Sequence, residues 1–401
     1  MCGRAFDVSG PRTVPGTCSV HRLHPASEGE TIPSVSPPEI PLLRVAGSLR
    51  DVGWQIGQAC GETIRRETAF EDSAIPSGRS RIEQLSLADR YRDVTARSMP
   101  WVLDELDACA AGAGVDPRAL FACCIEEIWY EARIAAGASA IEGRCSDMVA
   151  VPPATVGGGV FTAHNNDMPR RYMDDLVAIE RSVDSHPTVL TLGNGIWIST
   201  GWNSAGLNLT GNELSPNDER IGIPREIQVR AMLRERSLAG MVDVALHRER
   251  ASSYNNVLVD HRGAVANVEG SATDAVVHSA DERGHLAHTN HYVCEAMIRY
   301  EGDPEYAERS AVRLRRVAEL LENVPAGGVD ASLLRTFLSD HEHAPDSICR
   351  HETPGRSSFT CFWSVADMAA GTIAYGRGNP CDSRTQTYTF ARWPDHATAT
   401  S

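Results

Sequence analysis

The chain has 401 residues, of which 42% are hydrophobic and 23% charged, as in a soluble enzyme of one large or two ordinary domains. The net charge of −15 argues against a nucleic-acid partner, because phosphate binding needs clustered Lys and Arg. No apolar run approaches the roughly 20 residues of a membrane span, and the first residues lack the apolar core of a secretory signal. We therefore expect a cytoplasmic protein with no membrane partner.

The eleven cysteines are spaced irregularly, without a Cys-x-x-Cys pair. We expect reduced thiols, most of them buried as small apolar side chains. The spacing predicts no structural zinc site, and we expect neither a metal nor another cofactor. His341-Glu342-His343 is interpreted as a solvated loop, and hydrogen-bonding roles are expected for His288 and His291.

The first 38 residues are rich in Pro, Ser, Thr and Gly, which predicts a flexible tail. Pro41 to Gly47 is typical of a short strand. Ser48 then caps a helix, with Asp51 three residues on. Glycines inside this helical stretch would weaken a lone helix and therefore predict close packing: Gly53, Gly57 and Gly61.

Two further helical segments precede the centre of the chain. One is predicted from Ser86 to about Ala110. The other begins at Asp116-Pro117, with Asp as the N-cap and Pro in the first turn, and ends at Ala135 to Ala138.

At Cys145 the hydrophobic period changes from helical to strand-like. Met148 to Val151 is followed by a Pro/Gly-rich turn, and Val160 to Asp167 reads as a second strand with a polar end. A cysteine at the start of a hairpin, with amides and a carboxylate at its far end, suits acyl chemistry. Our central hypothesis is that the peptide bond before Cys145 is cut, so that Cys145 becomes both nucleophile and N-terminus.

Strands and helices alternate in blocks through the rest of the chain. Strands are expected at 188–195, 196–202 and 207–212 (a hairpin with its turn at 203–206), 254–260, 264–269, just before 288, 359–365 and 371–377, and helices at 224–235, 238–247, 308–322 and 331–340. This layout predicts an α+β sandwich in which two sheets lie between two helical layers.

The order of short motifs from about residue 41 to 385 resembles the penicillin acyltransferase-like (isopenicillin-N acyltransferase-like) family of self-cleaving cysteine N-terminal-nucleophile (Ntn) hydrolases. Singly these motifs are weak, but their order over most of the chain is a strong signal. They are Asn165-Asn166-Asp167, Trp202 to Leu207, Ser252 to Asn255, Thr289-Asn290-His291 and Gly376 to Cys381.

The resemblance implies a four-layer αββα sandwich preceded by a mainly helical N-terminal region. The chain would divide into a tail (1–38), a helical part (39–144) and a catalytic part (145–401), the last two separated by self-cleavage and staying associated. The implied substrate is a small-molecule amide or acyl thioester. A homo-oligomer stays open.

The resemblance also implies roles for individual residues. Cys145 matches the nucleophile, Asp167 the acid and Asn255 the oxyanion-hole amide. Further amides are expected at substrate- or oxyanion-binding positions: Asn166, Asn203 and Asn212.

The chain departs from the family pattern at two positions. Arg144 stands where the family has Gly before the nucleophile, and its Cβ could hinder the strained backbone that cleavage needs. Asn166 replaces a Trp, which makes that wall of the pocket more polar.

The chemistry follows from placing an amine and a thiol on one residue. A free α-amine has a pKa near about 8, so it can accept the thiol proton directly or through a water. Thiolate attack on a carbonyl then creates an oxyanion that amide N–H groups stabilise.

Three questions stay open at this point. Hydrolysis and acyl transfer differ only in whether water or an amine takes the acyl group. Arg144 favours an alternative, an unprocessed non-catalytic protein that binds a ligand or partner through the same cleft. A third reading is a Cys/His hydrolase of another fold, in which Cys145 works with His164 or His288 without chain cleavage.

Overall fold

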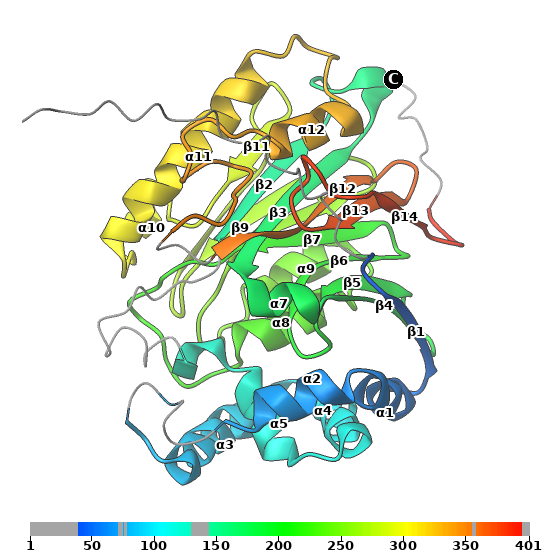
Figure 1. The fold of residues 1–401 in the computed structure, drawn as a ribbon, viewed down its shortest axis with the longest axis vertical. Coiled ribbons are helices and arrows are strands. Elements are labelled where there is room, and N and C mark those ends of the chain that lie inside the picture. Colours follow the sequence, from blue (N-terminus) through cyan, green and yellow to red (C-terminus); the bar gives the residue numbers. More distant parts are fainter. Residues whose placement is uncertain (1–38, 71–74, 76–77, 130–143, 355–357, 395–401) are drawn as a thin grey trace, which may run out of the picture. The chain divides into compact units, whose positions relative to one another are not determined.

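The computed structural model describes residues 39–70, 75, 78–129, 144–354 and 358–394 (Figure 1). The predicted tail, residues 1–38, lies outside the described residues. No helix of the described part is long and apolar enough to cross a bilayer.

The N-terminal region is mainly helical, as predicted. Its helices are α1 (Leu49–Ala59), α2 (Gly61–Thr68), α3 (Arg81–Ser98), α4 (Pro100–Ala113) and α5 (Pro117–Cys123). The predicted block from Ser86 to Ala110 is two helices, because Pro100 lacks the N–H that would continue α3 and instead begins α4. Helix α5 ends at Cys123, earlier than predicted, and the expected end at 135–138 lies outside the described residues.

Helix α1 packs against α4 at a distance that only glycine permits. A Cβ on Gly53 would lie 2.1 Å from the carbonyl oxygen of Glu105, and a Cβ on Gly57 would lie 2.0 Å from that of Cys109. The Ser48–Asp51 capping box is present at the start of α1. The sequence-based expectation of close packing is therefore confirmed for these two glycines.

Two sheets form the centre of the fold. The first has eight strands in the order β1-β4-β5-β6-β7-β8-β9-β10 and the second has six, in the order β11-β2-β3-β12-β13-β14. The strands of the first sheet are β1 (Leu42–Gly47), β4 (Val177–Val183), β5 (Val189–Gly193), β6 (Ile198–Asn203), β7 (Leu207–Asn212), β8 (Asn255–Asp260), β9 (Val265–Gly270) and β10 (Ala275–His278). Those of the second are β11 (His285–His288), β2 (Arg144–Ala150), β3 (Phe161–Pro169), β12 (Ser358–Asp367), β13 (Thr372–Arg377) and β14 (Gln386–Thr389).

The remaining helical elements whose full extent lies within the described residues come after the start of β2. They are the 3₁₀ turn η2 (Val156–Gly158), α7 (Arg170–Asp174), α8 (Arg225–Met232), α9 (Leu238–Ala245), α10 (Glu295–Ile298), α11 (Pro304–Glu322) and α12 (Ala331–Leu338). Figure 1 shows α11 and α12 on the side of β2 and β3, and α8 and α9 on the side of the eight-stranded sheet.

Three apolar clusters define the layers. The middle cluster joins both sheets, with Val149 of β2 and Val257 of β8 among its members. An outer cluster packs the six-stranded sheet against α11 and α12, and the other packs the eight-stranded sheet against α8 and α9. The predicted α+β, four-layer αββα sandwich with a helical N-terminal region is therefore confirmed.

The N-terminal region is also part of the sheet architecture. Strand β1 pairs in parallel with β4 at the edge of the eight-stranded sheet. The apolar cluster of α1 to α5 also includes Ile179 of β4 and Ile227 of α8. The described residues before Arg144 and the part that follows thus share one core.

Strands β4, β10 and β14 were not predicted. In β4 the alternation of apolar and polar residues is not visible in the sequence, because the charged residue Arg181 is buried. Its guanidinium donates to Thr191 Oγ1 at 2.6 Å and lies 3.9 Å from the carboxylate of Glu105. A buried arginine that is paired in this way reads as a surface residue in the sequence.

Candidate active site

Cys145 lies in β2, on the face that turns toward the eight-stranded sheet. Strand alternation puts Cys145, Asp147 and Val149 on this face, and Val149 belongs to the core between the sheets. Cys145 pairs with Asn166 in the β2–β3 ladder, and both side chains line a common cavity. The sequence thus placed the cysteine correctly at the start of a hairpin.

The main chain of Cys145 is held by two residues from distant segments. Its N–H donates to Oδ1 of Asn290 at 2.8 Å. The guanidinium of Arg313, on α11, donates to the same Oδ1 at 2.6 Å and to the carbonyl oxygen of Cys145 at 3.4 Å. The amide nitrogen of Asn290 in turn donates to the carbonyl oxygen of Glu213 at 3.1 Å. Both polar groups of the Cys145 main chain are therefore fixed at the site.

The thiol stands at the end of a polar chain. Asn166 Nδ2 lies 3.6 Å from Cys145 Sγ and donates to Ser199 Oγ at 2.8 Å. Ser199 Oγ is 3.3 Å from His164 Nε2, and His164 Nδ1 is 2.9 Å from Asp147 Oδ1. The hydrogen-bonded route from imidazole to thiol therefore passes through Ser199 and Asn166.

The electrostatic surroundings favour the protonated thiol of Cys145. Burial raises the pKa of Cys145 well above its usual value, and the nearby carboxylates of Asp147, Asp167 and Glu213 act in the same direction. The cation of Arg313 opposes them. A base or a new positive charge is needed before this thiol becomes a nucleophile at neutral pH.

Asp167 lies on the other face of β3 from Asn166. It is opposite Arg144 in the β2–β3 ladder and opposite Thr360 in the β3–β12 ladder. A bulge between Thr360 and Phe362 breaks the β12 register there, and Thr360 Oγ1 donates to Asp167 Oδ1 at 2.7 Å. Asp167 is thus placed beside the bond that precedes Cys145 rather than beside the thiol.

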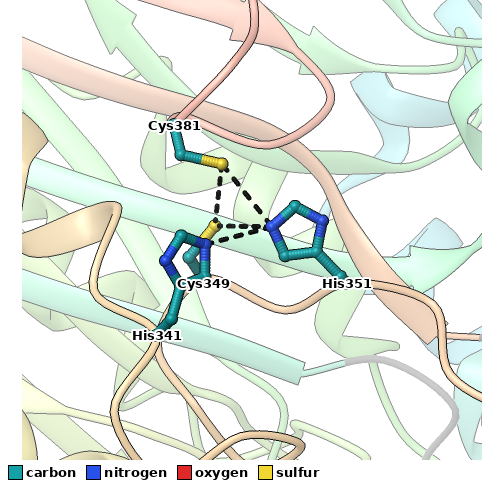
Figure 2. Close-up of side chains that lie close together, drawn as sticks. All are labelled: His341, Cys349, His351 and Cys381. Atoms are coloured by element: carbon teal, nitrogen blue, oxygen red, sulfur yellow. Dashed lines mark hydrogen bonds between the residues drawn. The ribbon is translucent and has the colours of Figure 1, made fainter. Parts of the chain in front are cut away.

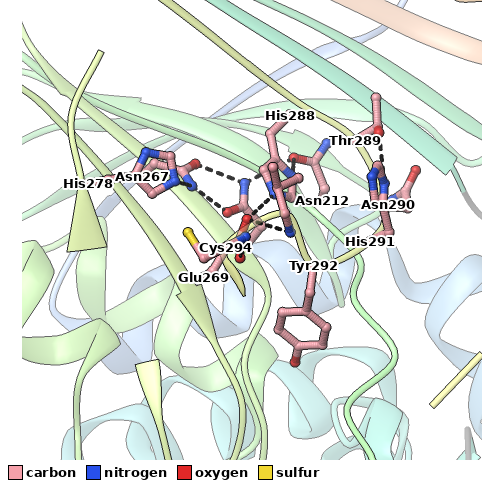
Figure 3. A network of polar contacts seen from close by, with 12 residues as sticks. Asn212, Asn267, Glu269, His278, His288, Thr289, Asn290, His291, Tyr292 and Cys294 are labelled. Carbon is pink, nitrogen blue, oxygen red and sulfur yellow. Dashed lines mark hydrogen bonds and ion pairs between the residues drawn. The ribbon is translucent and has the colours of Figure 1, made fainter. Parts of the chain in front are cut away.

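Asn212, Asn255 and Asn267 form a buried amide network. Figure 3 shows Asn212 and Asn267 of this network. Asn255 Nδ2 donates to Asn212 Oδ1 at 3.1 Å and to Asn267 Oδ1 at 2.9 Å, and Asn267 Nδ2 donates back to Asn255 Oδ1 at 2.7 Å. Both N–H bonds of Asn255 are therefore engaged. The amide nitrogen of Asn212 is buried without an acceptor among the described residues.

His288 connects this network to a carboxylate. Its Nδ1 is 3.0 Å from Asn212 Oδ1 and its Nε2 is 2.9 Å from Glu269 Oε1. Although burial raises the pKa of Glu269, the hydrogen bond and charge of His288 and two backbone N–H groups lower it overall. His291 Nδ1 lies 2.9 Å from Ser310 Oγ. Both histidines have the hydrogen-bonding roles that the sequence indicated.

A cavity of about 450 Å³ opens beside Cys145, a size that holds a small molecule. The N-terminal region contributes Glu67, Phe70, Cys123, Glu126 and Trp129 to its walls. The remaining walls are mostly apolar and aromatic, with Tyr172, Trp197 and Tyr254 among them. Asn256 lines the cavity, whereas Asn255, Asn212 and Asn203 are not among its lining residues in the described part of the chain.

A buried arginine joins the two parts of the chain at this cavity. Arg225 donates to Glu126 Oε2 at 2.7 Å and to Glu213 Oε1 at 3.3 Å, and its guanidinium stacks on Tyr254 at 4.4 Å. Glu126 belongs to the N-terminal region and Glu213 follows β7. The cavity is therefore built from both sides of the Arg144–Cys145 bond.

Asn203 lies at the β6–β7 turn. Its amide nitrogen donates to the carbonyl oxygens of Leu233 and Glu235 at 2.9 Å, and its Oδ1 accepts from the N–H of Ala205. These bonds hold the hairpin turn against the segment between α8 and α9. The sequence predicted a substrate- or oxyanion-binding position for Asn203. In the structure its hydrogen bonds go to the main chain of Leu233, Glu235 and Ala205.

Comparison with known proteins gives the family. The family model described as acyl-coenzyme A:6-aminopenicillanic acid acyl-transferase matches residues 155–382, and the chain belongs to this family. The penicillin acyltransferase-like resemblance is therefore confirmed. The matched range includes Asp167, Asn212 and Asn255 and begins after Cys145. A search of curated proteins gives no match.

Among solved structures the chain is similar to a variant of conjugated bile acid hydrolase from Clostridium perfringens, with 13% identity and a TM-score of 0.39 over 64% of this chain and 100% of that one. It is also similar to penicillin V acylase from Agrobacterium tumefaciens, with 14% identity and a TM-score of 0.39 over 58% of this chain and 83% of that one.

Several residues of the site carried weak or no sequence signals. Asn290 lies in the Thr289-Asn290-His291 motif, but no role was predicted for it. Arg313 is a fully buried arginine in a helix rich in charged residues, and nothing in the sequence distinguishes it from its neighbours. Ser199 lies in the middle of a predicted strand. Only the fold brings these three to Cys145.

Proposed function

We propose that the protein is a self-processing cysteine Ntn enzyme that hydrolyses or forms a linear amide bond on a small molecule through a thioester at Cys145. One observation carries the proposal. The main-chain nitrogen of Cys145 is held by an acceptor, Asn290 Oδ1, and the thiol of the same residue lines a cavity of small-molecule size. An N-terminal nucleophile needs both groups at one place.

The first step is cleavage of the chain. The Cys145 sulfur attacks the carbonyl carbon of Arg144, the C–N bond breaks, and the nitrogen leaves as an amine with the thiol proton. The resulting thioester is hydrolysed by water, which leaves a carboxylate on Arg144 and restores the thiol. Asp167, opposite Arg144 in the ladder, is positioned to assist this step.

The second step is turnover. The free α-amine, near about pKa 8 when unperturbed, accepts the thiol proton and is oriented by Asn290 Oδ1. The thiolate attacks the substrate carbonyl, and the oxyanion is stabilised by amide N–H groups, for which Asn212 Nδ2 and Asn166 Nδ2 are the candidates. The proton returns to the leaving group, and the acyl group stays on sulfur as a thioester. Water or an amine then attacks this thioester, which releases the acid or the new amide and restores the thiol.

Asn255 then acts through Asn212. Its donation to Asn212 Oδ1 fixes the orientation of that amide, with the Asn212 nitrogen left available. In this proposal Asn255 is a positioning residue, whereas the family resemblance alone assigned it the oxyanion contact.

The two chains stay associated after cleavage. The ion pair between buried Arg225 and half-buried Glu126 joins residues on the two sides of the cut, and so does the apolar cluster that α1 to α5 share with β4 and α8. The substrate cavity is complete only when both chains are present.

Product analysis tests the activity and separates its two versions. Purified wild type and Cys145→Ala are incubated with a panel of linear amides and acyl thioesters, with and without an added amine. Free acid as the product in both conditions indicates a hydrolase, and a new amide in the presence of the amine indicates an acyltransferase. Equal activity of wild type and the alanine variant would refute the proposal.

A second candidate is an unprocessed protein that binds a ligand in the same cavity. Arg144 favours it, because a Cβ before the nucleophile can hinder the strained backbone that cleavage requires. Ligand binding by an intact chain, equal in wild type and Cys145→Ala and without turnover, would support it.

A further inference from the structure

Four side chains that can bind a metal lie close together in the loops before β12 and after β13 (Figure 2). They are His341, Cys349, His351 and Cys381. Three come from the segment between α12 and β12, and Cys381 comes from the connection between β13 and β14. Their four candidate ligand atoms all lie within 4.8 Å of one another.

The separations fit a tetrahedral zinc ion. Zn–S bonds of about 2.3 Å and Zn–N bonds of about 2.0–2.1 Å imply separations of about 3.8 Å between two sulfurs, 3.6 Å between sulfur and nitrogen and 3.3 Å between two nitrogens. The structure has Cys349 Sγ and Cys381 Sγ 3.8 Å apart. His351 Nε2 is 3.5 Å from Cys381 Sγ, 3.9 Å from Cys349 Sγ and 3.0 Å from His341 Nε2.

We propose that His341, Cys349, His351 and Cys381 bind one structural zinc ion. Two thiolates and two imidazoles are a ligand set typical of zinc and unlike the oxygen ligands of magnesium or calcium. Four protein ligands leave no open position for water or substrate, so the ion is structural rather than catalytic. The two thiolate charges balance the charge of the ion.

A neighbouring amide supports the sulfur ligand. Asn379 Nδ2 lies 3.3 Å from Cys349 Sγ and also donates to the carbonyl oxygen of Arg350 at 2.6 Å. A donor directed at a ligand sulfur stabilises the thiolate and orients it. Cys349 is buried, and the other three ligands are exposed, so the ion can enter from solvent.

The zinc ion fixes the position of the segment between α12 and β12, which contacts the β2–β3 hairpin. Asn165, on β3, donates to the carbonyl oxygens of Leu338 and Ile348 at 2.9 and 3.0 Å. The N–H of Arg350 donates to Thr360 Oγ1 at 3.0 Å, and Thr360 in turn donates to Asp167. The ion thus fixes one end of a path that runs from Cys349 to Asp167.

A second group of possible ligands, Glu269, His278 and Cys294, carries no such proposal. Both carboxylate oxygens of Glu269 already accept hydrogen bonds, from His288, Val293 and Cys294. This group supplies the control. Cys294→Ser changes a half-buried thiol outside the proposed site and would remove the metal only if the second group held it.

The sequence predicted no zinc site because the four residues do not form two close pairs. The two cysteines are 32 positions apart in the chain. The proposal is independent of the enzymatic function.

The experiment measures zinc in the full chain purified without chelators or an affinity metal. Elemental analysis is expected to give one zinc per chain in wild type and in Cys294→Ser, and far less in Cys349→Ser, Cys381→Ser and His351→Ala. Wild type without zinc above the buffer blank overturns the proposal, as does full zinc content in the three ligand variants.

A second measurement uses wild type alone and does not depend on the folding of variants. The protein is stripped with a chelator and titrated with Co²⁺ under reducing conditions. The absorption spectrum of a tetrahedral cobalt–thiolate centre is expected, saturating at one equivalent. A spectrum of octahedral cobalt, or a Cys349–Cys381 disulfide in freshly purified wild type, overturns the proposal.

Discussion

The main-chain nitrogen of Cys145 and Oδ1 of Asn290 are 2.8 Å apart, although 145 residues separate them in the chain. Arg313 donates to the same oxygen, so its position is fixed from two sides. In the cleaved protein this nitrogen would be an α-ammonium, and the same acceptor would orient it next to the thiol. In the proposed mechanism the amine therefore depends on Asn290 for its orientation.

Asn290→Ala should slow both self-cleavage and turnover. A hydrogen bond to a charged group contributes about 1.5–3 kcal/mol, so its loss corresponds to a reduction in kcat of about 10- to 100-fold. The matched control is Asn290→Asp, which keeps an acceptor oxygen and should retain more activity than the alanine variant. Steady-state kinetics and the fraction of uncut chain measure the effect. Unchanged cleavage and kcat in the alanine variant would contradict the role of Asn290.

Asn212→Ala and Asn255→Ala should have non-additive effects on kcat. Loss of an oxyanion donor costs about 10²–10³ in rate. In the proposed mechanism Asn255 acts by holding Asn212 through a 3.1 Å hydrogen bond. Each single variant should therefore be strongly impaired, and the double variant should be little worse than Asn212→Ala. A double-mutant cycle on purified, cleaved proteins measures the coupling. Fully additive losses would show that the two amides act separately.

The stability of the protein should fall between pH 6.5 and pH 4 because of His291. Burial lowers the pKa of His291 from 6.5 to about 4, and the positive charges of His288 and Arg313 act in the same direction. The lowered pKa means that the folded state favours the neutral imidazole of His291. Its contribution to stability is fully present above the unfolded pKa of 6.5 and is lost as the pH falls through the folded pKa of about 4. The whole shift corresponds to about 3 kcal/mol. Chemical unfolding at several pH values should show this loss in wild type and a smaller one in His291→Gln. An equal loss in both proteins would assign the acid sensitivity to other groups.

Gly57→Ala should destabilise the protein, whereas Gly61→Ala should not. A Cβ on Gly57 would lie 2.0 Å from the Cys109 carbonyl oxygen, so α1 and α4 would have to separate. Overpacking of this kind costs about 1–3 kcal/mol or more. On Gly61 the nearest atom is the end of the Arg65 side chain at 3.0 Å, and the gain in helix propensity is about 1 kcal/mol. Thermal unfolding of the two variants compares them, and equal melting temperatures would contradict the close α1–α4 packing.

The sequence predicted the β2–β3 hairpin because its signals are local. A period change at Cys145, a Pro/Gly turn and a polar strand end define β2 and β3 without any distant contact. The amides of the β6–β7 hairpin were found for the same reason. The partner of Asn212 could not be assigned, because Asn255 lies opposite it only through the register of β7 and β8.

Other features depend on contacts between distant segments. Arg313 is fully buried because Asn290 and the Cys145 carbonyl oxygen accept its hydrogen bonds, and neither partner lies near it in sequence. Strand β4 was missed because Arg181 is buried against Thr191. The cluster of four possible zinc ligands (His341, Cys349, His351 and Cys381) was missed in the sequence. Its members come together only because the β13–β14 connection lies beside the segment that follows α12.

The central claim is that Cys145 frees its own amine, and intact mass spectrometry of purified wild type beside Cys145→Ala tests it most directly. The account predicts two chains for wild type, residues 1–144 and 145–401 before any trimming, and a single uncut chain for the variant. An uncut wild-type chain, folded as judged by circular dichroism, would contradict self-processing. The same two fragments from Cys145→Ala would show that another agent cuts the chain.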